Sequence, residues 1–185
     1  MRSLAARLAA PCIALAGAAL AGLPYNVSIA YQQNAKDYYL QAWYGDGNLY
    51  VGPNVPPSIK TVFDFTVPNI RADLLYVEPT TPGARLPNPT FLVVNNAPGA
   101  SDPVFFAHSA ADLTEDDRLF WFRYGNVLFP ILQDNSIQNY FHLDEVPGTP
   151  GTYLVRWREG VLAAVSSKDK TAMVNVELIA YTPPS

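Results

Sequence analysis

Apolar and polar residues alternate with a period of two through most of the chain. In one segment, Tyr153, Val155 and Trp157 alternate with Arg156 and Arg158. Two further segments share this alternation: residues 59–67 and 172–181. Because successive side chains of a β-strand point to opposite faces, each segment can bury one face and expose the other. The pattern is rich in aromatic and β-branched residues and therefore predicts an all-β protein.

Sequence segments typical of β-hairpins recur along the chain at a spacing of about 40 residues, which is the period of repeated β units. Four glycines precede a leucine by two or three positions: Gly47, Gly83, Gly125 and Gly160. Glycine suits hairpin turns that require a positive φ. The segment GTYLVRWREGVLAAVSS, residues 151–167, is predicted to be one such hairpin, with its turn at Arg158-Glu159-Gly160.

The repeated hairpins predict an antiparallel β-sandwich, with a β-trefoil-like barrel as the alternative. A trefoil has three units, whereas this chain has four glycine-containing repeats, so the sandwich is favoured. The 17 prolines, many of which flank the predicted strands, would help to protect strand edges. Residues 107–117 are expected to hold one short helical turn, with Ser109 or Thr114 as its N-cap.

The first 21 residues have the three parts of a secretory signal peptide. Arg2 and Arg7 give a positive start, residues 8–20 are apolar, and Ala19-Leu20-Ala21 is a small-residue cleavage site. A membrane anchor is the rival interpretation, but spanning a bilayer takes about 20 apolar residues. We therefore expect cleavage before Gly22, which leaves residues 22–185 as a single all-β domain that is secreted into the extracellular space.

The amino-acid composition excludes some classes of cofactor and disfavours some classes of binding partner. Cleavage would remove Cys12, the only cysteine, so the mature chain could form neither a disulfide nor a cysteine-based metal site. Loss of Arg2 and Arg7 would leave 10 basic against 16 acidic residues. An acidic chain is a poor partner for nucleic acid and for anionic membranes, since both are bound largely through Lys and Arg. We expect a monomer without a cofactor.

The signal peptide, the cysteine-free all-β body and the hairpin phrases together make the chain similar to small secreted proteins of filamentous fungi. Many of those proteins have no known function. The resemblance covers the whole mature chain and implies secretion and a β-rich fold. It brings no catalytic residue to any position of this sequence.

Candidate catalytic chemistry is sparse. His108 and His142 do not have the spacing of paired metal ligands. The segment HSAAD, residues 108–112, holds the three residue types of a catalytic triad, but a triad draws them from separate segments. A carboxylate-dependent glycoside hydrolase is the enzymatic alternative, and its candidate acids are Glu115, Asp116, Asp117, Asp144 and Glu145. We expect a non-catalytic protein, either a binding module or a structural secreted protein.

Surplus aromatic residues are the main candidates for binding. Exposed Trp and Tyr rings can stack on the apolar faces of sugars. We therefore take four residues as a candidate platform for an extracellular glycan or a cell-surface component: Trp43, Tyr44, Trp121 and Trp157. The interpretation that we favour places these rings in the core, at equivalent positions of different strands. Three loops are the candidate binding loops: residues 44–48, 95–102 and 133–139. Asn26, in Asn26-Val27-Ser28, is a candidate N-glycosylation acceptor.

Overall fold

The computed structural model describes residues 24–68, 74–87, 89–118, 120–160, 164–166 and 174–182. The predicted signal peptide, residues 1–21, lies outside the described residues. The prediction of an all-β protein is confirmed: the described chain contains fifteen strands and one short 3₁₀ helix. That helix, Ala110–Asp112, lies in the predicted segment. The Ser109 side chain caps it by accepting a hydrogen bond from the backbone N–H of Ala111 at 3.1 Å.

The strands have the following bounds. The first half of the chain forms β1 (Tyr25–Gln33), β2 (Lys36–Gly45), β3 (Asn48–Val51), β4 (Val62–Val67), β5 (Glu78–Pro79), β6 (Phe91–Asn95) and β7 (Ser101–Pro103). The second half forms β8 (Phe105–Ala107), β9 (Asp117–Arg118), β10 (Trp121–Tyr124), β11 (Val127–Pro130), β12 (Phe141–Glu145), β13 (Tyr153–Arg158), β14 (Ala164–Ser166) and β15 (Val174–Tyr181).

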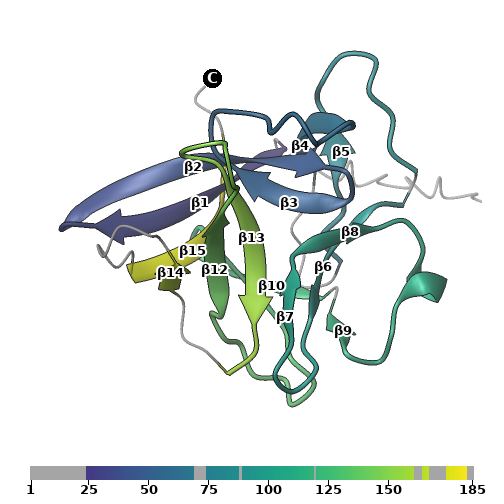
Figure 1. The fold of residues 1–185 in the computed structure, drawn as a ribbon. Coiled ribbons are helices and arrows are strands. Elements are labelled where there is room, and N and C mark those ends of the chain that lie inside the picture. The colour runs from purple at the N-terminus through teal and green to yellow at the C-terminus, as the bar shows by residue number, and fades with distance from the viewer. Residues whose placement is uncertain are drawn as a thin grey trace, which may run out of the picture.

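These strands join into one sheet that curls into a half-barrel and is antiparallel except for the parallel β12–β14 pair. Its main path runs β5-β4-β2-β1-β15-β14-β12-β13-β3-β8-β6-β9, with the β10–β11 hairpin attached through β15. A sandwich would divide these strands between two separate sheets. Here they are joined along one hydrogen-bonded path. Figure 1 shows the long β1–β2 hairpin projecting to the left, with β6 to β9 on the opposite side of the molecule.

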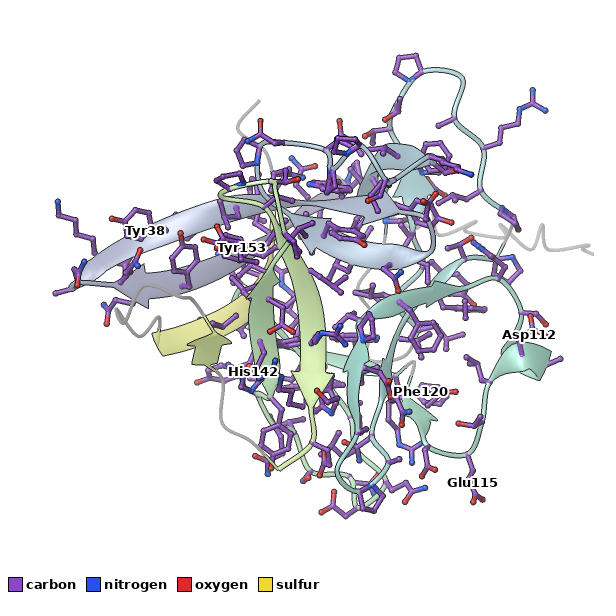
Figure 2. All side chains as sticks on the ribbon, in the orientation of Figure 1. Tyr38, Asp112, Glu115, Phe120, His142 and Tyr153 are labelled. Atoms are coloured by element: carbon purple, nitrogen blue, oxygen red, sulfur yellow. The ribbon has the colours of Figure 1, made fainter. Side chains whose placement is uncertain are left out.

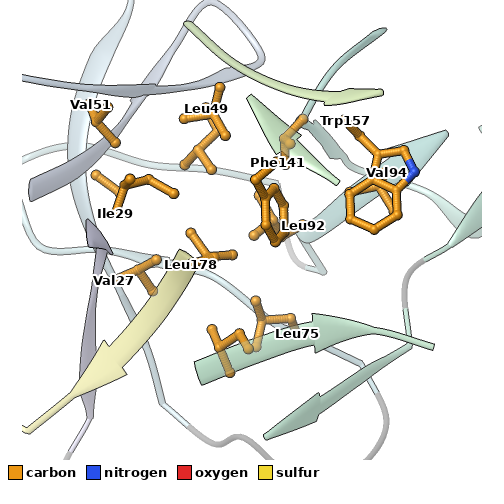
Figure 3. Packing of buried hydrophobic residues seen from close by; sticks show 14 of the residues in the cluster. Val27, Ile29, Leu49, Val51, Leu75, Leu92, Val94, Phe141, Trp157 and Leu178 are labelled. Carbon is orange, nitrogen blue, oxygen red and sulfur yellow. The ribbon is translucent and has the colours of Figure 1, made fainter. Parts of the chain in front are cut away.

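The inner side of the curl holds the hydrophobic core. Ile29, Leu49, Leu92, Phe141 and Leu178 come from five different strands and lie together in it (Figure 3). Each exposes 0 % of its surface. Burying a side chain of this size stabilises the fold by about 1.5–3 kcal/mol relative to leaving it in water. The predicted alternation is confirmed in β13, where Tyr153, Val155 and Trp157 are buried and the residues between them are half-buried.

Two tryptophans connect the middle of the sheet to β6. The Trp121 ring stacks in parallel on Phe141 at 6.3 Å between centroids, and the Trp157 ring meets the edge of Phe141 at 5.2 Å. The Trp121 indole N–H donates to the backbone carbonyl of Leu92 at 2.9 Å. The Trp157 indole N–H donates to the Asn96 side-chain oxygen at 3.3 Å. The polar atom of each buried ring therefore has a partner, as burial requires.

The hairpin predicted at Arg158-Glu159-Gly160 is wrong, although Gly160 has the expected positive φ of 73°. The two strands that flank this turn, β13 and β14, do not pair with each other. They lie on either side of β12, and β14 pairs with it in parallel. The reason is that both edges of β13 are already occupied, one by β12 and the other by β3 and β7. The predicted hairpin turn at Gly125 does join paired strands, β10 and β11.

Gly52 lies at the closest approach between two distant segments of the backbone. It follows β3 with a φ of 120°, a region that L side chains rarely adopt. A Cβ atom at this position would lie 2.3 Å from the carbonyl oxygen of Gly151 and 2.8 Å from the Cα of Thr152. Thr152 is fully buried, and its hydroxyl donates to the Asn54 carbonyl at 2.7 Å, so this crossing has little room to open.

We predict that Gly52→Ala destabilises the fold by about 3–5 kcal/mol, because backbone strain and overpacking both act there. Gly99→Ala is the matched control. Gly99 also has a positive φ, of 77°, but a Cβ there would meet nothing within 4 Å. The control should cost only about 1–2 kcal/mol. Urea denaturation of both variants measures the difference, and equal losses would contradict the tight crossing at Gly52.

Candidate functional site

The tryptophan platform is wrong, because the structure places all four of its residues in the core. Trp43 exposes 5 %, Tyr44 7 %, and Trp121 and Trp157 0 % of their surfaces. Trp43 stacks on Tyr50 at 4.7 Å between ring centroids. Rings with so little exposed surface cannot stack on a sugar. The structure supports the interpretation of these four residues as core side chains.

Other aromatic rings are exposed. Phe120, Phe122 and Tyr124 expose 49, 37 and 71 % of their surfaces. They are the outward neighbours of buried Trp121, in accord with the alternation of a strand. Phe122 lies opposite half-buried Phe129 on β11, so the outer face of the β10–β11 hairpin is apolar. Figure 2 shows Phe120 on the same side of the molecule as Glu115, away from the β1–β2 hairpin.

Two of the three predicted binding loops meet at one open pocket, which we call the loop pocket. Its volume is about 520 Å³. Loop 44–48 contributes two of its residues and loop 95–102 contributes two others. The complete described lining is Gly47, Asn48, Asn95, Asp102, Pro103, Phe105 and Asp117. The third predicted loop, 133–139, is not among these residues. It follows β11, and its turn is closed by a bond from the Leu132 N–H to the Ser136 carbonyl at 2.9 Å.

Strand register brings the lining residues together. Asn48, at the start of β3, pairs with Phe105 at the start of β8. Asn95, at the end of β6, pairs with Asp117 on β9. The β8 strand alternates, so Phe106 is buried with 5 % exposure whereas Phe105 is only half-buried and borders the pocket. The pocket therefore has an apolar wall, formed by Phe105 and Pro103, beside carboxylate and amide groups.

Hydrogen bonds fix the polar groups of the loop pocket. The Asn95 amide nitrogen donates to the Asp102 carboxylate at 2.8 Å, and its oxygen accepts from the Ala97 N–H at 2.9 Å. The Asp117 carboxylate accepts from the backbone N–H and the hydroxyl of Thr114, at 2.8 and 2.9 Å. Side chains held in this way lose less conformational entropy when a ligand binds.

Arg118 holds the turn that carries Asp117. Its side chain is almost fully buried, with 9 % exposure. The guanidinium group donates to the backbone carbonyls of Glu115 and Asp117, the latter at 2.8 Å. The same turn is bonded from the other side, because the Asn96 N–H donates to the Asp116 carbonyl at 2.9 Å. Residues 115–117 are thereby bonded both to Arg118 and to the loop that begins at Asn95.

Asp46 fixes the opposite side of the loop pocket. It precedes Gly47 in the β2–β3 turn, and its two carboxylate oxygens accept the backbone N–H groups of Lys60 and Thr61 at 3.0 and 2.8 Å. These two bonds, first that from Lys60, lower the pKa of the Asp46 carboxyl group below its usual value. Hydrogen bonds to the ionised form have this effect because they stabilise the charge.

The remaining candidate residues are not among the described residues that line the loop pocket. Asp144 makes ion pairs with Arg156 and Arg158, each at 2.7 Å. His108 shares a hydrogen bond with the Thr90 hydroxyl at 2.9 Å, whereas His142 is buried on β12 with 2 % exposure. No group of three or more His, Cys, Asp or Glu side chains is placed to hold a metal ion in the described part of the chain.

Asn26, the candidate glycosylation acceptor, is half-buried on β1 and pairs with Tyr181 and Thr66. Ser28, the third residue of the acceptor sequence, is buried with 3 % exposure. Glycosylation enzymes would therefore have to reach this segment before β1 pairs with its neighbours. Use of the site stays a prediction.

No family model, curated protein or solved structure matches the chain. Within the described residues, none of the helical structure has the length and apolar character needed to cross a membrane.

We predict that Asp46→Asn lowers stability at pH 7 and flattens its dependence on acid. The native pKa of Asp46 lies below its unfolded value, so its contribution is present above the unfolded pKa of about 4. That contribution is lost as the pH falls through the lowered native pKa. Urea denaturation at pH 7 and at pH 3 should show a gap between wild type and variant that narrows in acid. A gap of constant size would contradict the role of the carboxylate.

Proposed function

We propose that this chain is a secreted, non-catalytic binding domain that recognises a glycan on an extracellular or cell-wall surface through the loop pocket. The observation that carries the proposal is the convergence of residues 44–48 and 95–102 beside Phe105. Binding residues are commonly placed on loops that a rigid scaffold positions. Here the scaffold is the curled sheet, and the positioned groups are one aromatic ring, two amides and two carboxylates.

The chemistry of the pocket suits a sugar. A sugar ring has an apolar C–H face, which packs on an aromatic ring, and hydroxyl groups at its rim. Phe105 offers the ring. Asp102 and Asp117 offer carboxylate oxygens that can accept hydrogen bonds from hydroxyls. Asn48 has an amide that can both donate and accept. This combination of one apolar wall and several convergent polar groups is typical of small-ligand sites.

Export is the second part of the proposal. The charged start, apolar run and small-residue site of residues 1–21 support it. The mass of the protein recovered from culture medium tests it directly. Cleavage before Gly22 gives a chain without Cys12, whereas an intact chain from Met1 would contradict export by this route.

A carboxylate-dependent glycoside hydrolase is the second candidate function. The observation that favours it is that Asp102 and Asp117 line the same pocket, since such enzymes place two carboxyl groups on either side of the scissile bond. Release of reducing ends from a bound oligosaccharide, abolished by both Asp102→Asn and Asp117→Asn, would establish hydrolysis. Binding without any release would support the non-catalytic function.

We predict that Phe105→Leu weakens glycan binding by about 1–3 kcal/mol, which is about 5- to 150-fold in Kd, because it removes the aromatic wall. Leucine keeps most of the apolar volume against the small cluster of Phe91, Val93 and Ala107, on which Phe105 packs. A glycan array screened with residues 22–185 identifies the ligand, and titration calorimetry then measures the loss.

Phe129→Leu is the matched control, because Phe129 is also half-buried on a strand but is not among the described residues that line the loop pocket. The control should bind like wild type. An equal loss in both variants, or an unchanged Kd in Phe105→Leu, would contradict the assignment of the site. Failure of the folded domain to bind any glycan would favour a structural secreted protein instead.

A further inference from the structure

A second pocket lies on the outer face of the β1–β2 hairpin, remote from the loop pocket. We call it the hairpin pocket. Its volume is about 260 Å³, and its described lining is Ala30, Tyr31, Gln32, Asp37, Tyr39 and Glu177. Tyr39 is the exposed aromatic residue of this lining, with 66 % of its surface accessible, whereas Tyr31 is buried. An exposed tyrosine beside a hollow of this size is a candidate ligand platform.

Strand register explains the hollow. Ala30 on β1 lies between Tyr39 on β2 and Glu177 on β15, so these three side chains form one row across three strands. The methyl group of Ala30 is short, and it leaves space between the ring and the carboxylate. The next pair on the same face toward the hairpin tip is Gln32 and Asp37, whose side chains are joined by a hydrogen bond at 3.2 Å.

The charged residues in the described lining of the hairpin pocket have one sign. Asp37 and Glu177 contribute two carboxylates to the same lining as Tyr39, and none of the described lining residues is basic. Lys36, the nearest cation in sequence, pairs with Gln33 in the next row of β1–β2. Alternation along the strand directs Lys36 to the face opposite Asp37 and Tyr39. Aromatic rings and carboxylates both attract organic cations.

We propose that the hairpin pocket binds a sugar unit that carries a protonated amino group. The Tyr39 ring packs on the C–H face of the sugar, one carboxylate pairs with the ammonium group, and the Gln32 amide bonds a hydroxyl. This inference names a site and a ligand class beyond the proposed function, and it does not require the loop pocket to bind the same glycan.

The position of the hairpin pocket makes the domain bivalent if both pockets are used. Figure 1 shows the β1–β2 hairpin on one side of the molecule and β7, β8 and β9 on the other. Figure 2 places Tyr38, the neighbour of Tyr39, on the projecting hairpin and Glu115 on the opposite side. The elements that form the two pockets thus lie on opposite sides of the molecule, a placement suited to two polymer chains rather than to two units of one short oligomer.

The test is titration of residues 22–185 with three soluble oligosaccharides of equal length at pH 5.5, where amino groups are protonated. The probes are a β-1,4-linked glucosamine hexamer, its fully N-acetylated form and a glucose hexamer. The glucosamine hexamer should bind at least tenfold more tightly than the two neutral probes, and its affinity should fall as salt is raised. Equal affinity for all three would overturn the ligand class.

Variants then locate the site. Tyr39→Ala should lower affinity for the glucosamine hexamer at least tenfold. Tyr124→Ala is the matched control, because Tyr124 is exposed to 71 % but lies outside the described lining. Glu177→Gln preserves the size of the side chain and should weaken binding while reducing its salt dependence. Unchanged affinity in both Tyr39→Ala and Glu177→Gln, with the fold intact, would overturn the hairpin pocket.

Phe105→Leu separates the two pockets. If it leaves binding of the glucosamine hexamer unchanged while Tyr39→Ala removes it, the hairpin pocket is supported whatever the loop pocket binds. If Phe105→Leu removes this binding and Tyr39→Ala does not, the amino sugar occupies the loop pocket, and the inference about the hairpin is wrong.

Discussion

The burial of Trp121 and Trp157 against Phe141 is the constraint on which the rest of the structure depends. The three rings come from β10, β13 and β12, and the two indole N–H groups bond Leu92 and Asn96 in and just after β6. A curled sheet has a closed inner side only if its distant strands are held at a fixed separation. Large flat rings fill that space, and their polar edges satisfy buried oxygens that would otherwise be costly.

This constraint also positions the loop pocket. The bond from the Trp157 indole reaches Asn96, next to Asn95, whose amide orients Asp102. Trp157 therefore supports the loop pocket indirectly, by bonding the loop that carries its polar groups. Both pockets combine aromatic side chains with amides and two carboxylates, although different strands supply them. In a chain whose acidic residues outnumber its basic ones, that composition favours neutral or cationic ligands over anionic ones.

The local features of the structure could be predicted from the sequence. Alternation predicted the buried face of β13, the glycines predicted turns with positive φ, and two predicted loops meet at the loop pocket. In β10 both faces of the strand carry aromatic residues, so alternation could not choose between Trp121 and its neighbours Phe122 and Tyr124. The pairing of Asn48 with Phe105, and of Asn95 with Asp117, depends on register between distant strands. The same holds for β14, which pairs with β12 because β13 has no free edge.

Acrylamide quenching of tryptophan fluorescence tests the central claim most directly, because Trp43, Trp121 and Trp157 are the three tryptophans of the chain. They expose 5, 0 and 0 % of their surfaces, so we predict blue-shifted emission and little quenching in the folded protein. Denaturation should shift the emission to the red and make all three indoles accessible together. Strong quenching of the folded protein would contradict the buried tryptophans, and with them the account of how the sheet is held and where ligands bind.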